Sequence, residues 1–363
     1  MYNVKIIGAG SIGNHLAHAS RTLGWHVTLC DVDQAALDRT QFQIYPTRYG
    51  AWDEAITLTL AADAPRGGFD LIIIGTPPDS HLPLALEALT ENPKALLIEK
   101  PLCPPSLDGA ETLKTQVSES NTFAFVGYDH VVGQAAQETS RASQRLQSIE
   151  TIDVEFREHW GGIFAAHPWL QGPQDSYLGF WNRGGGASGE HSHAINLWQF
   201  FSTQLGKGRI IEVSATLEYV KTDNVDSDKL CLLHFKTETG LIGRVVQDVI
   251  TSPSRKWARI QGANGYVELT IGHEPGVDQV HWKLNQDDVQ NRTIHKTRPD
   301  DFIWELQTID AVVQGKETTS PISLERGLET MMVVSAAHLS HANKRTVHIH
   351  YDKGYIPQAL ELL

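Results

Sequence analysis

The sequence predicts an α/β domain with a doubly wound parallel sheet over residues 1–126, and an α+β domain with an open antiparallel sheet over residues 127–363. Three observations predict this division. In the first part, short apolar runs alternate with helical patterns. A glycine-rich turn follows the first of these runs. In the second part, from residue 209 onward, segments with period-two character follow one another without helices between them, which indicates antiparallel strands.

The predicted elements of the first domain follow a repeated strand–helix order. Residues 69–75 are almost continuously apolar, as expected for a strand covered on both faces. The other predicted strands are residues 2–7, 25–31, 95–99 and 122–126. Helices are expected from the glycine turn to residue 23, from residue 34 onward, and over residues 81–90.

The second domain is predicted to begin with a helix over residues 134–147. Glycine-containing turns at residues 238–240 and 262–265 separate neighbouring strands. The predicted strands are residues 150–159, 209–220, 229–236, 242–251, 255–261 and 266–271. Two further helices are expected near the end of the chain, over residues 300–314 and 324–342.

Composition excludes several classes of protein. The 363 residues carry 30 basic and 43 acidic side chains, a net charge of −13, which argues against nonspecific binding to nucleic acid or to anionic membranes. The longest apolar runs are far shorter than the roughly 20 residues of a membrane-spanning helix. Cys30, Cys103 and Cys231 lack C-x-x-C spacing, so we expect no disulfide framework and a reducing, cytoplasmic location.

The turn after the first strand reads G-x-G-x-x-G, with Gly8, Gly10 and Gly13 at its fixed positions. The first glycine permits a tight turn, the second permits close approach of a pyrophosphate, and the third permits close helix–strand packing. The next helix begins at Ser11 and Ile12, where free N–H groups favour phosphate. Asp31 ends the second strand, where a carboxylate accepts hydrogen bonds from a ribose 2′-hydroxyl. These features predict a Rossmann domain that binds NAD rather than NADP.

Two further segments lie at the ends of predicted parallel strands, where a dinucleotide crevice is expected. Thr76, Pro77 and His81 follow the third predicted strand and are expected near the cofactor, although His81 could simply belong to the start of a helix. Glu99 and Lys100 follow the next one and precede a proline. An ammonium group at Lys100 could stabilise an alkoxide that develops beside the nicotinamide.

A second cluster follows a run of three glycines at residues 184–186. On one continuous helix, Glu190, His193 and Asn196 would share a face because they are three residues apart. Histidine suits general-base chemistry near neutral pH, and a neighbouring carboxylate can orient its ring. His191 and His193 are only two residues apart and would diverge on a helix, so no metal site is predicted; both could also be packed, hydrogen-bonded residues.

The order of these motifs resembles the Gfo/Idh/MocA family, which includes glucose–fructose oxidoreductase and inositol dehydrogenase. The resemblance implies a Rossmann domain, an open antiparallel sheet through which subunits associate, and a homodimer or homotetramer. It also implies NAD(P)-dependent oxidation or reduction at a carbinol of a sugar, sugar acid, inositol or nucleotide sugar. By position, Lys100 is the Glu-Lys-Pro lysine of the family and His193 is the histidine that follows the glycine run.

The chain departs from the family pattern at three places. In the family pattern, the acid lies one residue further from the histidine than Glu190 lies from His193. The acid position therefore aligns with Glu190 when counted from the glycine run and with Gly189 when counted back from the histidine, and we place it at Glu190. Asn196 stands where an aspartate often follows the histidine. The segment Tyr128, Asp129 and His130 replaces an Asn/Arg-Phe pattern and is expected to line the nicotinamide or substrate pocket.

We therefore expect hydride transfer between a substrate CH–OH group and nicotinamide, with a small polar, carbohydrate-like substrate. His193 would exchange the hydroxyl proton, Lys100 would stabilise the alkoxide, and Glu190 would orient His193 or bind a hydroxyl. Further candidates for substrate contact are Arg183, Asn182, Trp181, His167 and Trp169. Two alternatives stay open: a redox-neutral hydrolase or lyase with tightly held NAD, and a nonenzymatic NAD-binding regulator.

Overall fold

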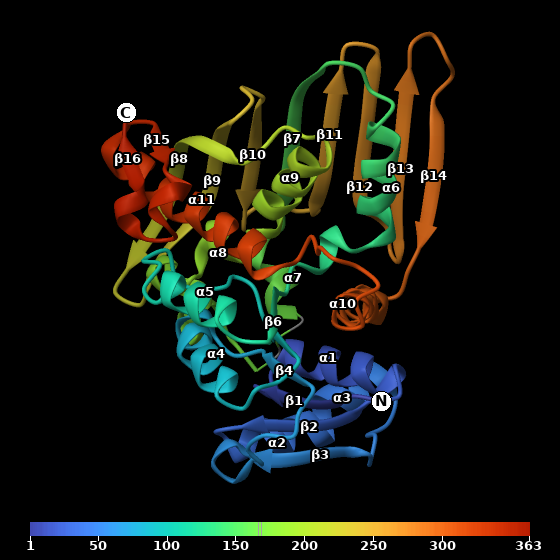
Figure 1. The fold of residues 1–363 in the computed structure, drawn as a ribbon, viewed down its shortest axis with the longest axis vertical. Coiled ribbons are helices and arrows are strands. Elements are labelled where there is room, and N and C mark those ends of the chain that lie inside the picture. The colour runs from blue at the N-terminus through green and yellow to red at the C-terminus, as the bar shows by residue number, and fades with distance from the viewer. Residues whose placement is uncertain (166, 168) are drawn as a thin grey trace.

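A computed structural model describes residues 1–165, 167 and 169–363, and its first sheet is the predicted parallel one (Figure 1). Its six strands lie in the order β3-β2-β1-β4-β5-β6 and all pair in parallel. The strands are β1 Asn3–Ile7, β2 His26–Asp31, β3 Ile56–Leu60, β4 Leu71–Ile74, β5 Ala95–Ile98 and β6 Phe123–Val126. The edge strand β3 was not predicted, because only Ile56 in it is buried and its pattern is short.

Helices cover both faces of this sheet, which is why β4 and β5 are buried at every residue. Helix α1 follows the glycine turn as predicted, whereas α5 was not foreseen. The helices are α1 Ser11–Thr22, α2 Gln34–Arg39, α3 Tyr45–Tyr49, α4 His81–Leu89 and α5 Ala110–Ser118.

The glycine turn has the shape that its sequence requires. Gly8 has φ +110°, and a Cβ atom there would lie 2.6 Å from the carbonyl oxygen of Gly75. A Cβ atom on Gly13 would lie 2.0 Å from the carbonyl oxygen of Gly8. A Cβ atom on Gly10 would meet nothing within 4 Å. The first and third glycines therefore permit packing, while the second leaves open space beside the N-terminus of α1.

The second sheet has ten strands and is mainly antiparallel, with one parallel pair between β7 and β10. The order is β14-β13-β12-β11-β7-β10-β9-β8-β15-β16. The strands are β7 Ile149–Arg157, β8 Ile210–Thr222, β9 Val225–Thr237, β10 Ile242–Asp248, β11 Arg255–Gly262, β12 Gly265–Glu274, β13 Val277–Leu284, β14 Gln290–His295, β15 Val347–Ile349 and β16 Leu360–Leu362. The last four strands were not predicted. The predicted fold class, a doubly wound parallel sheet followed by an open antiparallel sheet, is confirmed.

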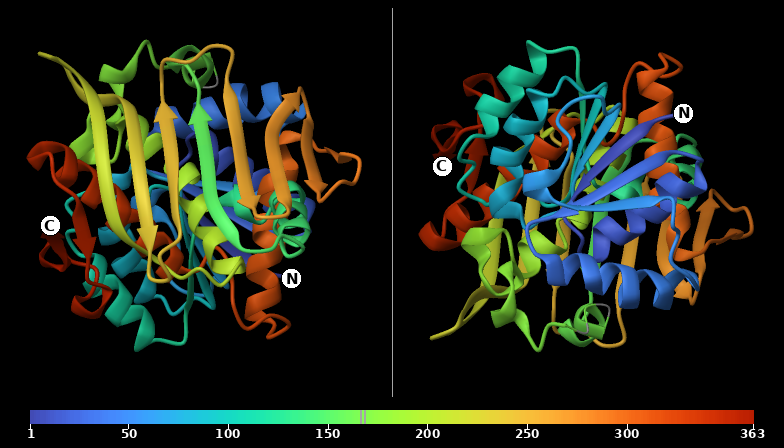
Figure 2. Two further views of the ribbon diagram at one scale, coloured as in Figure 1. Left: turned by 90° about the horizontal axis from the view of Figure 1, so that it is seen from above. Right: turned by 90° about the horizontal axis from the view of Figure 1, so that it is seen from below.

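Helices pack on one face of the second sheet, in front of the strands in Figure 1. The other face is turned toward the viewer on the left of Figure 2. Along β9 the exposed side chains of Leu232 and His234 alternate with buried ones and therefore belong to this face. Helix α11 is buried along most of its length, as a helix between two sheets should be. The helices are α6 Gln134–Ser143, α7 Trp160–Ala165, α8 Gly186–Glu190, α9 His193–Gln204, α10 Arg298–Val313 and α11 Leu324–Asn343.

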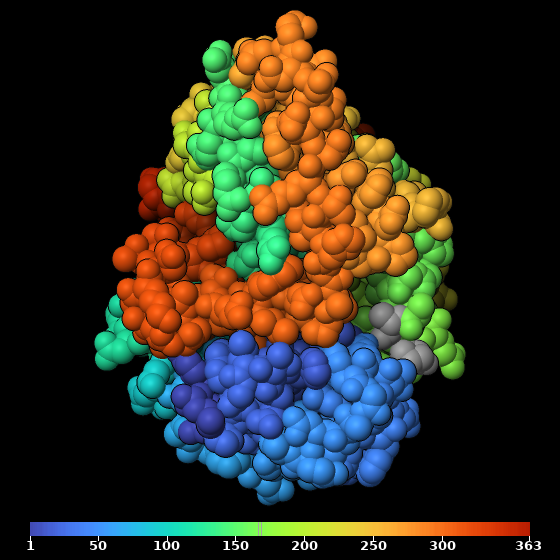
Figure 3. Space-filling model, turned by 90° about the vertical axis from the view of Figure 1, so that its right-hand side faces the viewer, coloured from blue at the N-terminus to red at the C-terminus, as the bar shows by residue number. Residues whose placement is uncertain are grey.

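The C-terminal part of the chain returns to the parallel sheet at two places. Helix α10 packs on α1, where the Phe302 ring stacks on His15 with centroids 4.9 Å apart. Figure 3 shows this orange region resting directly on the blue N-terminal residues. The backbone N–H of Val126 also donates to the carbonyl oxygen of Ile322 at 2.8 Å. These contacts place the second sheet over the crevice at the carboxyl ends of the parallel strands.

Among the described residues, none of the helices is both long enough and apolar enough to cross a membrane.

Glycine substitutions test the geometry of the turn. We expect Gly13→Ala to lower the free energy of unfolding by about 2 kcal/mol or more, because the new methyl group overlaps the Gly8 carbonyl. Gly10→Ala, which enters open space, is the matched control and should stay within about 1 kcal/mol of the wild type. Urea unfolding followed by circular dichroism measures both, and equal midpoints for the two variants would contradict this packing.

Candidate active site

The ends of β1, β2, β4 and β5 bring the predicted cofactor segments to one edge of the parallel sheet. The Gly75 N–H donates to the carbonyl oxygen of Ile7, which joins the loop after β4 to the glycine turn. Asp31 accepts a hydrogen bond from the N–H of Ala9 at 2.7 Å. Its carboxylate is therefore held beside the glycine turn.

His81 lies behind this crevice rather than in it. Its ring is fully buried, with Nε2 2.7 Å from the carbonyl oxygen of Thr76 and Nδ1 3.0 Å from that of Pro101. Burial lowers the pKa of His81 to about 4, so the ring is neutral at pH 7. The expectation that His81 lies against the cofactor is wrong, because the histidine instead joins the two loops that follow β4 and β5.

A cavity of about 380 Å³ lies between the two sheets. Both parts of the chain line it, and it contains most of the side chains predicted to do chemistry. From the N-terminal part come Ser11, Ile12, His15, Glu99, Lys100 and Gly127. From the C-terminal part come Asp129, His130, Phe156, Glu158, Gly162, Ile163, His167, Glu190, His191, His193, Lys256, Ile271, Gly272, Gly276, Val277, Asp278, Lys296, Arg298, Asp301 and Phe302.

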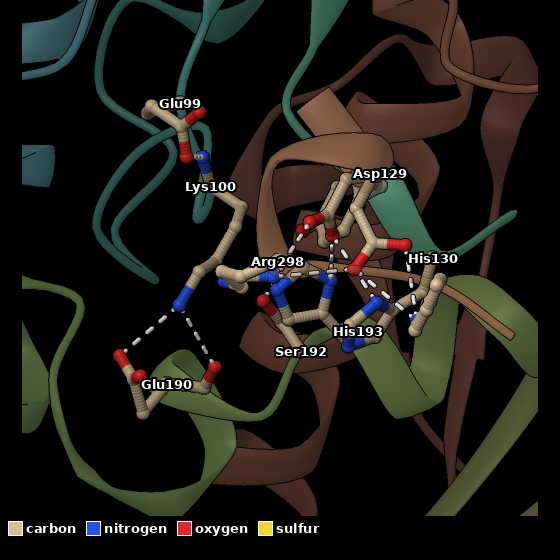
Figure 4. Close-up of polar contacts among 11 residues, drawn as sticks. Glu99, Lys100, Asp129, His130, Glu190, Ser192, His193 and Arg298 are labelled. Atoms are coloured by element: carbon tan, nitrogen blue, oxygen red, sulfur yellow. Dashed lines mark hydrogen bonds and ion pairs between the residues drawn. The ribbon is translucent and has the colours of Figure 1, made fainter. Parts of the chain in front are cut away.

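Lys100 reaches across the cavity to the end of α8 (Figure 4). Its Nζ donates to Oε2 and to the backbone carbonyl of Glu190, each at 3.1 Å. Burial opposes ionisation of Glu190, but the ammonium of Lys100 and nearby His191 still lower the pKa of the carboxyl group. Behind Lys100, burial and the charge of Asp129 raise the pKa of Glu99 to about 8, and the Glu99 side chain packs against Gly127. Glu99 therefore lines the cavity next to Lys100 as a carboxyl group that is mostly protonated at pH 7.

The predicted face shared by Glu190, His193 and Asn196 does not exist. Helix α8 ends at Glu190 and α9 begins at His193, because the chain turns at His191 and Ser192. Glu190 therefore faces Lys100, and Asn196 is buried with its amide donating to Thr330 at 3.1 Å. The structure therefore pairs Glu190 with Lys100 instead of His193 and buries Asn196 away from the cavity lining, while the expectation that Glu190 binds a substrate hydroxyl stays a prediction.

Asp129 is the carboxylate that faces His193 (Figure 4). Its Oδ1 lies 3.8 Å from Nδ1 of His193 and 3.3 Å from Nδ1 of His130, while Oδ2 lies 3.5 Å from Arg298. Burial, with help from His130 and Lys100, lowers the pKa of His193 well below its usual range. Burial alone would raise the pKa of Asp129, but the positive charges of Arg298 and Lys296 lower it. The arrangement is a neutral imidazole beside an ionised carboxylate.

Several other predicted contacts lie outside the cavity. Tyr128 is fully buried, and its hydroxyl donates to Ser192 at 3.3 Å, so it supports the junction of α8 and α9 rather than a ligand. Arg183 is partly exposed and pairs with Asp79 at 2.7 Å. Trp181 stacks on His338, with ring centroids 4.5 Å apart. Asn182 is exposed, and Trp169 lies against Arg39, so of the five further candidates only His167 lines the cavity.

Sequence reasoning missed three cationic residues of the cavity. Lys256 lies on β11, Lys296 follows β14, and Arg298 is the first residue of α10. Lys256 pairs with Glu158 at 3.0 Å, and Lys296 pairs with Asp278 at 2.9 Å and with Asp301 at 3.0 Å. No local motif marks these residues, because they come from separate strands and meet only after the sheet has formed.

A buried cluster fixes the short helix α8 that presents Glu190. The Ser188 N–H and hydroxyl donate to the Asp228 carboxylate at 2.7 and 3.0 Å, and the hydroxyl also lies 3.0 Å from Nε2 of His338. Gly186 has φ +76°, and a Cβ atom there would lie 2.1 Å from the Asp228 carboxylate. The glycine run is therefore needed for this close approach.

Comparisons with known proteins agree with this geometry. Residues 2–128 match the family model GFO_IDH_MocA, described as an oxidoreductase family with an NAD-binding Rossmann fold. No curated protein sequence matches the chain significantly. The chain is thus similar to this family over residues 2–128, and the expected resemblance is confirmed. The description of this family model agrees with the expected NAD-binding Rossmann fold and with the expected class of oxidoreductase.

Solved structures extend the likeness in fold to nearly the whole chain. GenD2 from gentamicin A biosynthesis, in complex with NAD, is 19% identical with a TM-score of 0.74 and covers 96% of each chain. Levoglucosan dehydrogenase, in complex with NADH and levoglucosan, is 17% identical with a TM-score of 0.74, covering 96% of this chain and 98% of its own. A putative myo-inositol dehydrogenase from Sinorhizobium meliloti 1021 is 19% identical with a TM-score of 0.73, covering 96% and 99%. At these identities the likeness establishes the fold.

The role of His81 is testable. We expect His81→Ala to lower the free energy of unfolding by about 2–3 kcal/mol, because it removes a fully buried ring and leaves the backbone carbonyl group to which that ring donates without its partner. The variant should also bind NADH more weakly, since both crevice loops lose their connection. Urea unfolding and a fluorescence titration with NADH measure the two effects. His26→Ala, at an exposed strand position, is the control, and equal stability of the two variants would contradict the role.

Proposed function

We propose that the protein transfers a hydride between nicotinamide and a carbinol of a sugar, sugar acid, inositol or nucleotide sugar. The observation that carries this proposal is that Lys100 and His193 line one cavity with Ser11 and Ile12 of the glycine turn. A lysine and a histidine that face one cavity beside a dinucleotide crevice suit the removal of a hydroxyl proton during oxidation.

The residues at the crevice fit NAD. Open space at Gly10 and the free N–H groups at the start of α1 can receive the pyrophosphate, and Asp31 is placed for ribose hydroxyls. A carboxylate at this position repels a 2′-phosphate, so NAD is favoured over NADP. When bound, NAD⁺ supplies the acceptor for the hydride.

The protein groups divide the proton chemistry between them. In oxidation, Lys100 donates a hydrogen bond to the substrate hydroxyl, and the hydroxyl proton passes to His193 as the carbinol hydride leaves. The charge of Asp129, whose Oδ1 lies 3.8 Å from Nδ1 of His193, stabilises the resulting imidazolium. Glu190 holds the ammonium of Lys100 over the cavity, which is a different role from the one that the sequence suggested.

The dense polar lining supports a polyhydroxylated substrate. Three ion pairs present both hydrogen-bond donors and acceptors to the cavity, namely Lys100–Glu190, Lys256–Glu158 and Lys296–Asp278. Two structurally similar proteins are named for substrates of this type, levoglucosan and myo-inositol. We also propose a cytoplasmic location and a homodimer or homotetramer; the three cysteines are free and buried, which suits a reducing compartment.

A panel of polyols, sugar acids and nucleotide sugars, each supplied with NAD⁺ and followed by NADH absorbance, tests the proposal. Accumulation of NADH with at least one compound is expected. Conversion of a compound without net NADH, together with NAD retained through purification, would indicate a redox-neutral hydrolase or lyase. Binding of NADH with no conversion of any compound would indicate a regulator.

Replacement of Lys100 should affect turnover far more than cofactor binding. We expect Lys100→Met to lower kcat by about 100-fold or more, because the developing alkoxide loses its cationic partner. The dissociation constant for NADH should stay within about twofold of the wild type, as measured by fluorescence titration. Lys221→Met, an exposed lysine far from the cavity lining, is the control. A kcat for Lys100→Met equal to that of the control would exclude the role.

Replacement of His193 tests the proton acceptor. His193→Asn keeps a polar side chain of similar size but cannot accept the hydroxyl proton, so kcat should fall by about 10²–10⁴-fold. NADH affinity should be preserved. Steady-state kinetics on the best substrate measure the change, and an undiminished rate would rule out His193 as the base.

A further inference from the structure

Three side chains in the cavity point potential metal-ligand atoms at one another. The atoms are Oδ1 of Asp129, Nδ1 of His130 and Nδ1 of His193, and all lie within 4.8 Å of one another. All three atoms are buried, and none has a hydrogen-bond partner. Within the described part of the chain, this is the one group of three or more His, Cys, Asp or Glu side chains that meets this criterion.

The distances between these atoms do not suit direct hydrogen bonds. The separation of 3.8 Å between Asp129 and His193 is too long, and that of 3.3 Å between Asp129 and His130 exceeds the usual N–H···O range. Ligand atoms that each lie about 2.0–2.1 Å from a tetrahedral ion are separated from one another by about 3.3–3.4 Å. The Asp129–His130 distance already has this value, and the Asp129–His193 distance needs a small contraction.

The chemistry of the three donors selects the kind of ligand. Buried polar atoms without partners are costly, so a ligand or a water molecule is expected between them. Two imidazoles with one carboxylate favour zinc and related transition-metal ions over magnesium or calcium, which prefer oxygen ligands. We propose that Asp129, His130 and His193 form a binding site for one divalent transition-metal ion of the zinc type.

The surroundings are compatible with a cation in spite of nearby positive charges. Lys100, Lys256 and Lys296 each already pair with a carboxylate of the cavity. Arg298 lies 3.5 Å from Oδ2 of Asp129, which leaves Oδ1 for the ion. The ligands are also well supported, since Asp129 and His130 directly follow the buried segment after β6 and His193 begins α9.

Three protein ligands leave at least one coordination position open toward the cavity, which is the pattern of catalytic rather than structural zinc. In the metal-loaded protein, this position would take an oxygen atom of the substrate or of water. The ion would then occupy Nδ1 of His193, and Nε2 would carry the ring hydrogen. His193 can therefore accept the substrate proton only in the metal-free protein. This consequence rests on the proposed function, whereas the binding of the ion does not.

The test is a calorimetric titration of chelator-treated full-length protein with ZnCl₂, in the absence of cofactor and substrate. We expect saturable uptake of one equivalent of zinc per chain and no comparable uptake of MgCl₂. Asp129→Asn and His130→Gln should each weaken zinc binding at least about 10-fold. His295→Gln, at an exposed position of β14, is the matched control for zinc bound by surface histidines and should bind as the wild type does.

Titration with NADH confirms that each variant is folded. Absence of saturable zinc uptake in the wild type would overturn the proposal. Zinc uptake that Asp129→Asn and His130→Gln leave unchanged would overturn it as well, because the ion would then lie elsewhere. NAD⁺-dependent turnover by the metal-free protein, measured separately, tests the proposed function and does not depend on these results.

Discussion

The ion pair between Lys100 and Glu190 connects the two halves of the molecule at the cavity. Lys100 follows the buried strand β5, and Glu190 ends a short helix ninety residues later in the chain. Because both side chains are largely withdrawn from water, the pair holds its geometry better than an exposed pair would. The position of the ammonium group over the cavity, and thus the proposed chemistry, depends on this contact.

Packing around the pair explains features that have no chemical role of their own. The glycine run permits α8 to approach Asp228, which in turn holds Ser188 and leaves Glu190 at the helix end. His81 holds the loop that carries Lys100 against the loop after β4. Buried polar contacts of this kind specify one arrangement of loops that hydrophobic packing alone would leave loose.

Local patterns in the sequence predicted the parts of the fold that depend on local physics. The glycine turn, the buried parallel strands and the long helix α11 each carry a signal within a few residues. The strands β3 and β13–β16, which lie at or next to the edges of the two sheets, were missed, because partly exposed strands carry only a weak pattern. Lys100 and His193 were predicted and do share one cavity. The partnership of His193 with Asp129 was not foreseen, because it depends on where the helix breaks and on how the turn at residues 129–131, after β6, packs on α9.

A crystal structure of the protein with NADH would test the proposed active site most directly. The nicotinamide ring should lie in the cavity between the glycine turn and the junction of α8 and α9, with Lys100 and His193 facing the same side of the ring. A nicotinamide ring bound elsewhere, or turned so that these two side chains lie on opposite sides of it, would contradict the proposed hydride transfer.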